Sequence, residues 1–181
     1  QETSISVAAI LLYTAPAFVL VLSRLFFKEK LTGKKLISLL LTLFGCMLVV
    51  QVLPNGSINM TWFGIIAGLG SGLFYALYSI FGKFALRKYG DMTITIYTFI
   101  FAAGFVIPFS QIWNYSHILV NPSVWLYGAA LGLFPTVLAF ILYTRGLAHV
   151  EAGKASIVAT LEPVVAALIG MFFYYEILTL Y

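Results

Sequence analysis

Charged residues are scarce in this sequence. Only 9% of its 181 residues are charged, whereas 62% are hydrophobic, and the mean hydropathy is +1.03. A soluble domain needs far more charge than this on its surface, while a helical bundle surrounded by lipid needs almost none. The composition therefore excludes a soluble globular protein and predicts an integral membrane protein.

Cysteine, aspartate and catalytic motifs are almost absent as well. The single cysteine, Cys46, excludes an internal disulfide and a cysteine metal site, and we interpret it as a small packing residue. The only aspartate is Asp91, and the sequence contains no HExxH motif, paired-acid motif or P-loop. His117 and His149 have no metal-ligand partner at helical spacing. These absences disfavour an enzyme or an ATP-driven pump, and no cofactor is expected.

What the sequence does contain is a series of apolar runs, each near the twenty or so residues that cross the hydrocarbon core as a helix. The expected spans are about 5–27, 36–53, 60–84, 92–112, 124–148 and 155–175. We therefore predict an all-α membrane protein with six transmembrane helices.

Basic residues indicate the orientation of these spans. All ten lie in or beside the loops that follow the first, third and fifth spans, and the two loops between contain no charged residue. Lys and Arg stay on the cytoplasmic side of short loops, so we expect these basic loops in the cytoplasm and the protein in the cell membrane. The net charge of +4 is then a topology signal, and no nucleic-acid partner is expected. The residues are Arg24, Lys28, Lys30, Lys34, Lys35, Lys83, Arg87, Lys88, Arg145 and Lys154.

The beginning and the end of the chain repeat each other. An offset of 147 residues aligns Pro16 with Pro163 and Glu29 with Glu176, and each copy is an apolar run with a central proline and a final Glu-x-Leu-Thr turn. The second copy comes five spans after the first, an odd number, so the two cross the membrane in opposite directions. Inverted repeats of this kind are typical of secondary transporters.

Three stretches resemble a known family. They are ASIVATLEPVVAALIG followed by Glu176-Ile177-Leu178, SVAAILLYTAPAFVLVL followed by Glu29-Lys30-Leu31, and GLGSGLFYALYSIFGKFAL. They are similar to EamA-type members of the drug/metabolite transporter superfamily, and the resemblance covers essentially the whole chain. In that family a glycine often precedes the turn glutamate, where this chain has Lys28 and Tyr175.

The resemblance implies a ten-helix bundle of two inverted five-helix halves, with the six spans as helices four to nine and both termini in the cytoplasm. It also implies that the first, third, fifth and sixth spans line a central cavity and that the second is peripheral. On this basis residues 1–53 end the first repeat with two spans, and residues 54–181 form the second repeat with four spans and the last one missing. We expect about three spans before Gln1 and one after Tyr181.

Prolines inside spans are expected to break helices. A proline removes one backbone hydrogen bond and frees the carbonyl four residues earlier, so Pro16 and Pro163 would release Leu12 and Ala159. A kink satisfied by a neighbouring hydroxyl is the preferred interpretation for a single proline such as Pro135. The repeat-equivalent positions of Pro16 and Pro163 favour a functional break instead.

Small residues recur in the third span. Gly64, Gly68 and Gly72 fall four apart on one helix face, where they let another helix approach closely. Packing against another span of the same molecule is the preferred interpretation, and a homodimer through this face is the alternative.

Glu162 is the only acidic residue well inside a span. A charged side chain at a span centre costs roughly 2.5 to 3.5 kcal/mol on insertion scales, so we expect Glu162 to face the bundle interior and to be protonated or paired. Two roles are open. Glu162 caps the half-helix that restarts at Pro163, or it exchanges a proton or binds a cationic substrate.

Polar side chains at membrane depth complete a predicted substrate or proton pathway, although most such hydroxyls merely bond a backbone carbonyl. The predicted set is Glu162, Pro163, Pro16, Thr160, Tyr13, Thr14, Tyr75, Tyr78, Ser79, Thr136 and Tyr143.

The function that fits these patterns is a secondary active transporter, an exporter or permease of small metabolites or drugs that works by alternating access, with proton coupling as one of the two roles open to Glu162. A membrane scaffold or receptor without transport activity is the alternative. No Lys or Arg lies deep in a span, which favours a neutral, zwitterionic or cationic substrate over a phosphorylated one.

Overall fold

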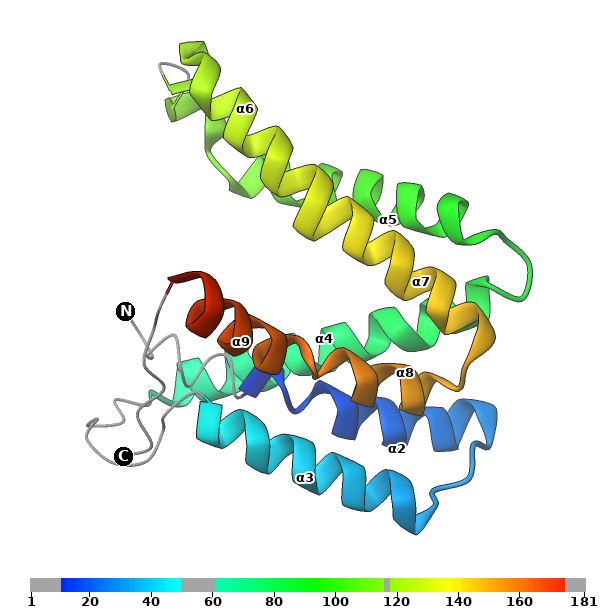
Figure 1. The fold of residues 1–181 in the computed structure, drawn as a ribbon. Coiled ribbons are helices and arrows are strands. Elements are labelled where there is room, and N and C mark those ends of the chain that lie inside the picture. Colours follow the sequence, from blue (N-terminus) through cyan, green and yellow to red (C-terminus); the bar gives the residue numbers. More distant parts are fainter. Residues whose placement is uncertain (1–10, 50–60, 116–117, 175–181) are drawn as a thin grey trace. The chain divides into compact units, whose positions relative to one another are not determined.

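The computed structural model describes residues 11–49, 61–115 and 118–174. Within these residues every regular element is a helix, which confirms the all-α prediction (Figure 1). The chain forms two compact units. Unit 1 is made of Gln1–Phe81 and Val150–Tyr181, and unit 2 is made of Gly82–His149.

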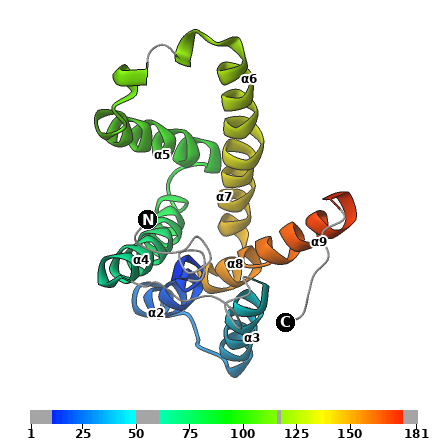
Figure 2. The same ribbon diagram turned by 90° about the vertical axis from the view of Figure 1, so that its left-hand side faces the viewer.

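Unit 1 is a bundle in which α8 packs against both α2 and α3, while α3 also packs against α9. Figure 2 shows α2, α3 and α8 side by side. Its core consists of apolar side chains that are almost fully buried, including Val19, Leu20, Ala76, Ile80 and Ala152. The helices are α2 Ala15–Phe27, α3 Gly33–Val49, α4 Trp62–Ala85, α8 Ala152–Ala159 and α9 Glu162–Tyr174, the end of α4 belonging to unit 2.

The glycines of α4 allow close packing within unit 1. A Cβ atom at Gly68 would lie 2.6 Å from Leu11 Cδ1, and one at Gly72 would lie 3.0 Å from Thr14 Oγ1 and 3.1 Å from the carbonyl oxygen of Leu11. Real Cβ atoms hardly ever approach so closely, so only glycine fits at these two positions without a shift. This confirms that the small-residue face packs against another span of the same molecule.

Helix α2 ends at a strained residue. Lys28 has φ 56° and ψ 28°, the left-handed conformation, and its N–H donates to the carbonyl of Ser23. Glycine is the usual residue at such a C-terminal position because it has no Cβ atom to clash. Lys28 therefore occupies a glycine-like backbone conformation directly before the turn residue Glu29.

Unit 2 is built around α5 and α7, which pack along each other. Phe99 and Phe140 meet edge to face with ring centroids 5.3 Å apart, and Asp91 and Arg145 form an ion pair of 3.3 Å. The Nζ atom of Lys83 donates to the carbonyl of Leu147 at 2.6 Å. The elements are α5 Asp91–Val106, η1 Ile107–Phe109, η2 Ile112–Tyr115, η3 Ile118–Val120, α6 Pro122–Leu131, η4 Gly132–Leu138 and α7 Ala139–His149.

Pro135 lies in η4, a π-helical segment that joins α6 to α7 without a break. The Oγ1 atom of Thr136 donates to the carbonyl of Leu131 at 3.0 Å. Leu131 is the residue whose helical donor Pro135 removes. The predicted hydroxyl partner of the freed carbonyl is therefore confirmed here, and the local widening is of the kind called a π-bulge.

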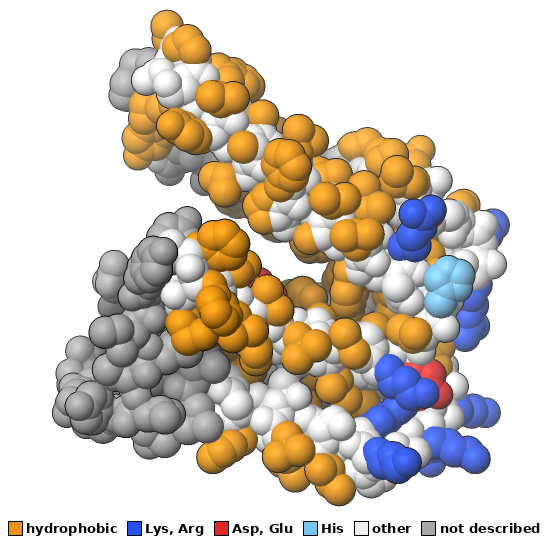
Figure 3. Space-filling view, in the orientation of Figure 1, with side chains coloured by type: hydrophobic (Ala, Val, Ile, Leu, Met, Phe, Trp, Pro, Cys, Tyr) orange, Lys and Arg blue, Asp and Glu red, His pale blue; other side chains and the backbone are white. Residues whose placement is uncertain are grey.

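Four helical stretches are long and apolar enough to cross a membrane: Trp62–Ala85, Asp91–Phe109, Pro122–His149 and Ala152–Phe173. They match four of the expected spans. The count of six full-length spans is not reproduced in the described residues, because α2 has 13 residues and α3 has 17, and parts of their expected spans lie outside them. Hydrophobic side chains cover much of the surface of the described residues in Figure 3, and many large ones are exposed, as lipid-facing helices require. The chain is an integral membrane protein.

Candidate functional site

The first span is interrupted just before Pro16. Residues 13–14 form a turn between a helical segment and the start of α2. The N–H and the Oγ1 of Thr14 both donate to the carbonyl of Leu11, at 3.2 and 2.6 Å. Because Pro16 has no N–H, the carbonyl of Leu12 lacks its usual helical donor.

The last span is interrupted in the same way. Residues 160–161 form a turn between α8 and α9, and Pro163 is the second residue of α9. The N–H and the Oγ1 of Thr160 donate to the carbonyl of Ile157, at 3.3 and 2.5 Å. Pro163 cannot donate to the carbonyl of Ala159.

The two breaks are equivalent by the repeat, since the offset of 147 residues places residues 160–161 on residues 13–14. In the described part of the chain no hydrogen bond reaches the carbonyl oxygen of Leu12 or of Ala159. Leu131, freed by Pro135, is satisfied by Thr136. The breaks in the repeated spans thus leave open acceptors, whereas the isolated proline does not.

Both breaks line one pocket of unit 1. Its volume is about 50 Å³, enough for water molecules but not for a metabolite, so the pocket must widen to admit one. The lining residues include four that carry a hydroxyl, one that carries a carboxylate, and Leu12 and Ala159, whose carbonyls lack a donor, with no Lys or Arg among them. These are Leu12, Tyr13, Ala15, Pro16, Tyr75, Ser156, Ala159, Thr160 and Glu162.

Glu162 contributes the carboxylate of this pocket from the first turn of α9. Its side chain is exposed in this structure, and among the described residues it has no hydrogen-bond or ion-pair partner. The expected pairing is therefore not seen there, and neither is a hydrogen bond that would cap α9. A negative charge in the first turn of a helix is still favoured by the helix dipole.

The pocket brings together five of the eleven residues predicted from the sequence: Tyr13, Pro16, Tyr75, Thr160 and Glu162. The others lie elsewhere. Thr14 uses its hydroxyl on Leu11, and Pro163 is buried beside a second pocket with Cys46 of α3. Ser79 is fully buried and donates to the carbonyl of Tyr75 at 3.3 Å.

Tyr78 belongs to α4 but does not line the pocket, and its side chain is half-buried. Thr136 and Tyr143 belong to unit 2. Thr136 there has the structural hydrogen bond to Leu131 described above.

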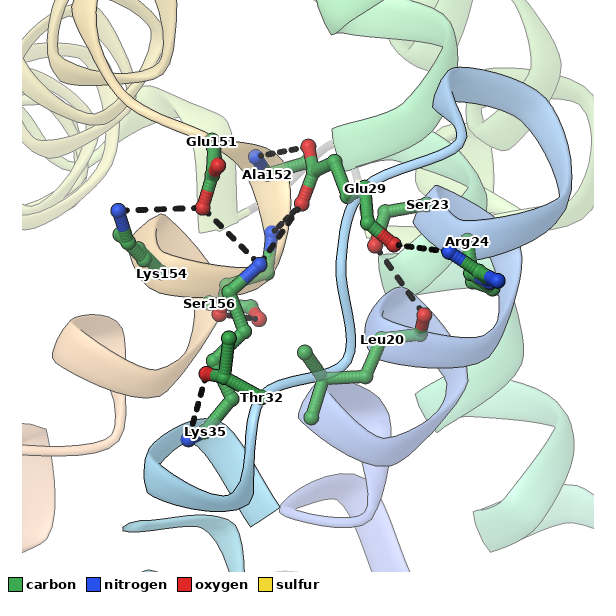
Figure 4. Close-up of polar contacts among 11 residues, drawn as sticks. Leu20, Ser23, Arg24, Glu29, Thr32, Lys35, Glu151, Ala152, Lys154 and Ser156 are labelled. Carbon is green, nitrogen blue, oxygen red and sulfur yellow. Dashed lines mark hydrogen bonds and ion pairs between the residues drawn. The ribbon is translucent and has the colours of Figure 1, made fainter.

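Sequence reasoning missed a cluster of charged side chains at the lysine-rich end of unit 1. We call Glu29, Lys35, Glu151 and Lys154 the Glu29 cluster. Glu29 lies between α2 and α3, and its Oε1 accepts from the N–H of Ala152 at 3.0 Å while its Oε2 accepts from Gly153 at 3.4 Å (Figure 4). The Glu29 carboxylate thus caps the N-terminal end of α8, which begins 123 residues later in the chain.

Lysines complete the cluster. The Nζ atom of Lys35 lies 3.4 Å from Glu29 Oε2 and 2.9 Å from Glu151 Oε2, and Lys154 lies 3.2 Å from the same Glu151 oxygen. The side chains of Lys35 and Glu29 are only 7% and 9% exposed. The repeated Glu-x-Leu-Thr turn was the sequence signal for this site, but it did not name the partners of Glu29.

The charges of the cluster shift two pKa values. Burial alone would lower the pKa of Lys35, but its hydrogen bond to Glu151 and the charge of Glu29 outweigh this and raise the pKa above its usual range. The hydrogen bonds from Lys35 and then from Lys154 lower the pKa of Glu151. Both groups therefore stay charged at neutral pH.

Comparison with known proteins gives the family. The sequence profile of the EamA-like transporter family matches residues 1–51 and 62–181. The chain belongs to the EamA-like transporter family. An uncharacterized transporter of Archaeoglobus fulgidus is 34% identical over 180 residues, which is 99% of this chain and 62% of that relative.

Two relatives in Bacillus subtilis are more distant. The uncharacterized transporter YxxF is 26% identical over 176 residues, 96% of this EamA-family chain and 55% of the relative. The uncharacterized transporter YwfM is 28% identical over 182 residues, 99% of the chain and 60% of the relative. The chain thus spans less than two thirds of the length of these relatives. No solved structure matches it.

Proposed function

We propose that this chain forms part of a secondary transporter of small metabolites or drugs that works by alternating access, as an exporter or permease. The observation that carries the proposal is the convergence of two repeat-equivalent helix breaks on one pocket with a single carboxylate. Interrupted helices at the centre of an inverted repeat are how many secondary transporters build a substrate site. A scaffold or receptor would need neither the breaks nor an acid at membrane depth.

The pocket supplies acceptors rather than cations. The open carbonyls of Leu12 and Ala159 can accept hydrogen bonds, and the hydroxyls of Tyr13, Tyr75 and Thr160 can donate or accept them. With the Glu162 carboxylate and no Lys or Arg in the wall, this set suits a neutral, zwitterionic or cationic substrate. A phosphorylated substrate would find no counter-charge among these residues.

Glu162 couples transport to protons in this proposal. Its side chain is exposed and has no partner among the described residues, which leaves the carboxylate available to bind a proton or a cationic group. When the protein closes around the site, the carboxylate needs a proton or a positively charged partner, because an unpaired charge at membrane depth is costly. Glu162 would then take up a proton or keep a cationic substrate as its partner.

The orientation of this transporter in the cell membrane follows from the positions of its basic residues. We place the lysine-rich loops on the cytoplasmic side of that membrane. Residues 1–53 and 54–181 are parts of two inverted repeats in this proposal. The packing of Gly68 and Gly72 against the region around Leu11 favours use of that face within the molecule over a homodimer.

Reconstitution tests the proposed function. The intact protein in proteoliposomes should take up at least one of three probes in response to a pH gradient: ethidium as a cation, threonine as a zwitterion, or glucose as a neutral solute. Glu162→Gln, which keeps the shape but cannot titrate, should lose gradient-driven uptake, and Glu162→Asp should retain part of it. Equal uptake in the parent and in empty liposomes for all three probes would favour the scaffold or receptor alternative.

A further inference from the structure

The Glu29 cluster lies at one end of the same helices whose other ends line the pocket. Helix α8 begins at Ala152, which donates to Glu29, and after eight residues it ends at Ala159 in the pocket wall. Helix α2 begins in the pocket wall at Ala15 and Pro16 and leads to Glu29 at the other end. Each helix is a short rigid connection, about 12 to 20 Å long, between the cluster and the pocket.

The two helices are in close contact next to the cluster. A Cβ atom at Gly153 would lie 2.6 Å from Leu20 Cδ2 and 3.4 Å from Glu29 Oε2. Leu20 is buried, and so is Ala152. Helices α2 and α8 are therefore in direct contact at this end, and the Glu29 carboxylate bonds across the contact.

Charged groups are unusual for such a contact, because burying them costs free energy that only good partners offset. Glu29 has two backbone N–H groups and the Lys35 ammonium as partners, and Lys35 has two carboxylates. If α8 separated from α2, water would solvate both charges at once. A charged contact can therefore open at a modest cost, whereas an equally tight apolar contact would expose hydrophobic surface to water.

We propose that Glu29 and Lys35 are the latch of a gate at the lysine-rich end of the transport pathway, closed in this structure and opened when α8 separates from α2. Glu29 is the positioning residue that joins the two helices. Lys35 neutralises Glu29 and Glu151 together. The inference rests on the alternating access proposed above.

Cysteine accessibility measures the state of this gate without any knowledge of the substrate. Ser156 lines the pocket, is buried, and is three residues beyond Gly153, and cysteine is close to it in size. In a Cys46→Ala background of the intact protein, Ser156→Cys is labelled with an impermeant thiol reagent from each side of sealed vesicles. A Gly33→Cys protein, with its label site at the start of α3, shows which side carries the lysine-rich end.

When Glu29→Gln or Lys35→Gln is added, the cysteine of Ser156→Cys should be labelled about tenfold faster from the lysine-rich side. A change of about 1.4 kcal/mol in an equilibrium corresponds to this factor. Labelling from the opposite side should become slower, because opening one gate closes the other. A general loosening of the bundle would speed labelling from both sides. That result, or unchanged labelling from both sides, would overturn the latch.

Lys34→Gln is the matched control. Lys34 neighbours Lys35, loses the same charge on substitution, is exposed, and has no ion pair among the described residues. In the Lys34→Gln background, Ser156→Cys should be labelled at a rate within about twofold of that in the parent, because an exposed charge contributes little to the stability of the contact. Rates for Lys34→Gln equal to those for Lys35→Gln would mean that net charge, not the latch, sets accessibility.

The labelling result separates the latch from the proposed function. Unchanged labelling in Glu29→Gln with normal transport by the parent would remove the latch and leave transport standing. Opposite shifts on the two sides without flux of any probe would support the gate and contradict transport of those probes.

Discussion

The Oγ1 atom of Thr136 donates a hydrogen bond of 3.0 Å to the carbonyl of Leu131, the group that loses its helical donor at Pro135. The equivalent carbonyls next to the other two prolines, at Leu12 and Ala159, receive no hydrogen bond in the described part of the chain. A threonine adjoins each of the three prolines, but Thr14 and Thr160 bond carbonyls three residues back instead. The helix thus continues through Pro135 as a π-helical segment, whereas the helix breaks at Pro16 and Pro163 leave carbonyls without a donor.

The hydrogen bond of Thr136 should serve stability alone. Thr136→Val keeps the shape of the side chain and removes the hydroxyl donor of the Leu131 carbonyl, which keeps the N–H of Thr136 as its π-helical donor, so it should lower the free energy of unfolding by no more than about 1 kcal/mol. Flux per folded protein should not change. Thr98→Val is the matched variant, because Thr98 bonds the Ile94 carbonyl, which also has its helical N–H, and its loss should be similar. Thermal unfolding in detergent measures both, and a loss of flux per folded protein in Thr136→Val would contradict the assignment.

Lys28→Gly should stabilise the protein. The left-handed conformation of Lys28 costs a side-chain-bearing residue about 1 kcal/mol, and glycine adopts it freely. Lys30→Gly in the same turn is the control, since Lys30 is not among the described non-glycine residues with positive φ. A lower melting temperature for Lys28→Gly than for the parent would show that the lysine side chain is needed there.

Two glycines of α4 should differ sharply in their response to alanine. Gly72→Ala would place a Cβ atom 3.1 Å from the carbonyl oxygen of Leu11, and the backbone cannot move away without disturbing the break, so we expect destabilisation of about 1 to 3 kcal/mol. Gly70 has nothing within 4 Å of its Cβ position, and Gly70→Ala should be neutral or slightly stabilising. Equal melting temperatures would mean that the helices do not approach as closely as described.

The positions of the breaks could be predicted because proline acts on its own backbone, independently of the rest of the fold. The repeat offset then paired Pro16 with Pro163. The partners of Glu29 could not be predicted, since Ala152 and Gly153 are far away in the chain and meet it only through the packing of α2 on α8.

The type of a residue alone also did not show whether its side chain lies on the pocket-facing side of its helix. Residues 75 and 78 of α4 are both tyrosines, three positions apart, yet of these two only Tyr75 lines the pocket. Which face of a helix points to the pocket depends on its neighbours. Thr136 shows the same limit, since its hydroxyl is used by the backbone beside Pro135.

The pH dependence of transport should come from Glu162 and not from the Glu29 cluster. The pKa of Glu151 is lowered, so its pairing with Lys35 is lost only as the pH falls through that lowered value. The pKa of Lys35 is raised, so the pairing is also lost as the pH rises through that raised value. Between about pH 5 and pH 9 the pair stays charged.

In that window the flux of the parent should change with pH, and any residual flux of Glu162→Gln should not. The glutamine variants of His117 and His149 are the controls and should keep the parent's profile. A pH profile that persists in Glu162→Gln but disappears in a histidine variant would assign proton coupling to that histidine.

The most direct test of the transport site compares the prolines themselves. Pro16→Ala and Pro163→Ala restore the missing N–H groups and close the open acceptors at Leu12 and Ala159, whereas Pro135→Ala restores a donor to a carbonyl that is already satisfied. Initial rates of probe uptake are measured in proteoliposomes with equal amounts of folded protein. The account predicts a loss of at least about tenfold for each of the first two variants and a rate near that of the parent for Pro135→Ala. Parent rates in Pro16→Ala and Pro163→Ala would contradict the claim that the two breaks form the transport site.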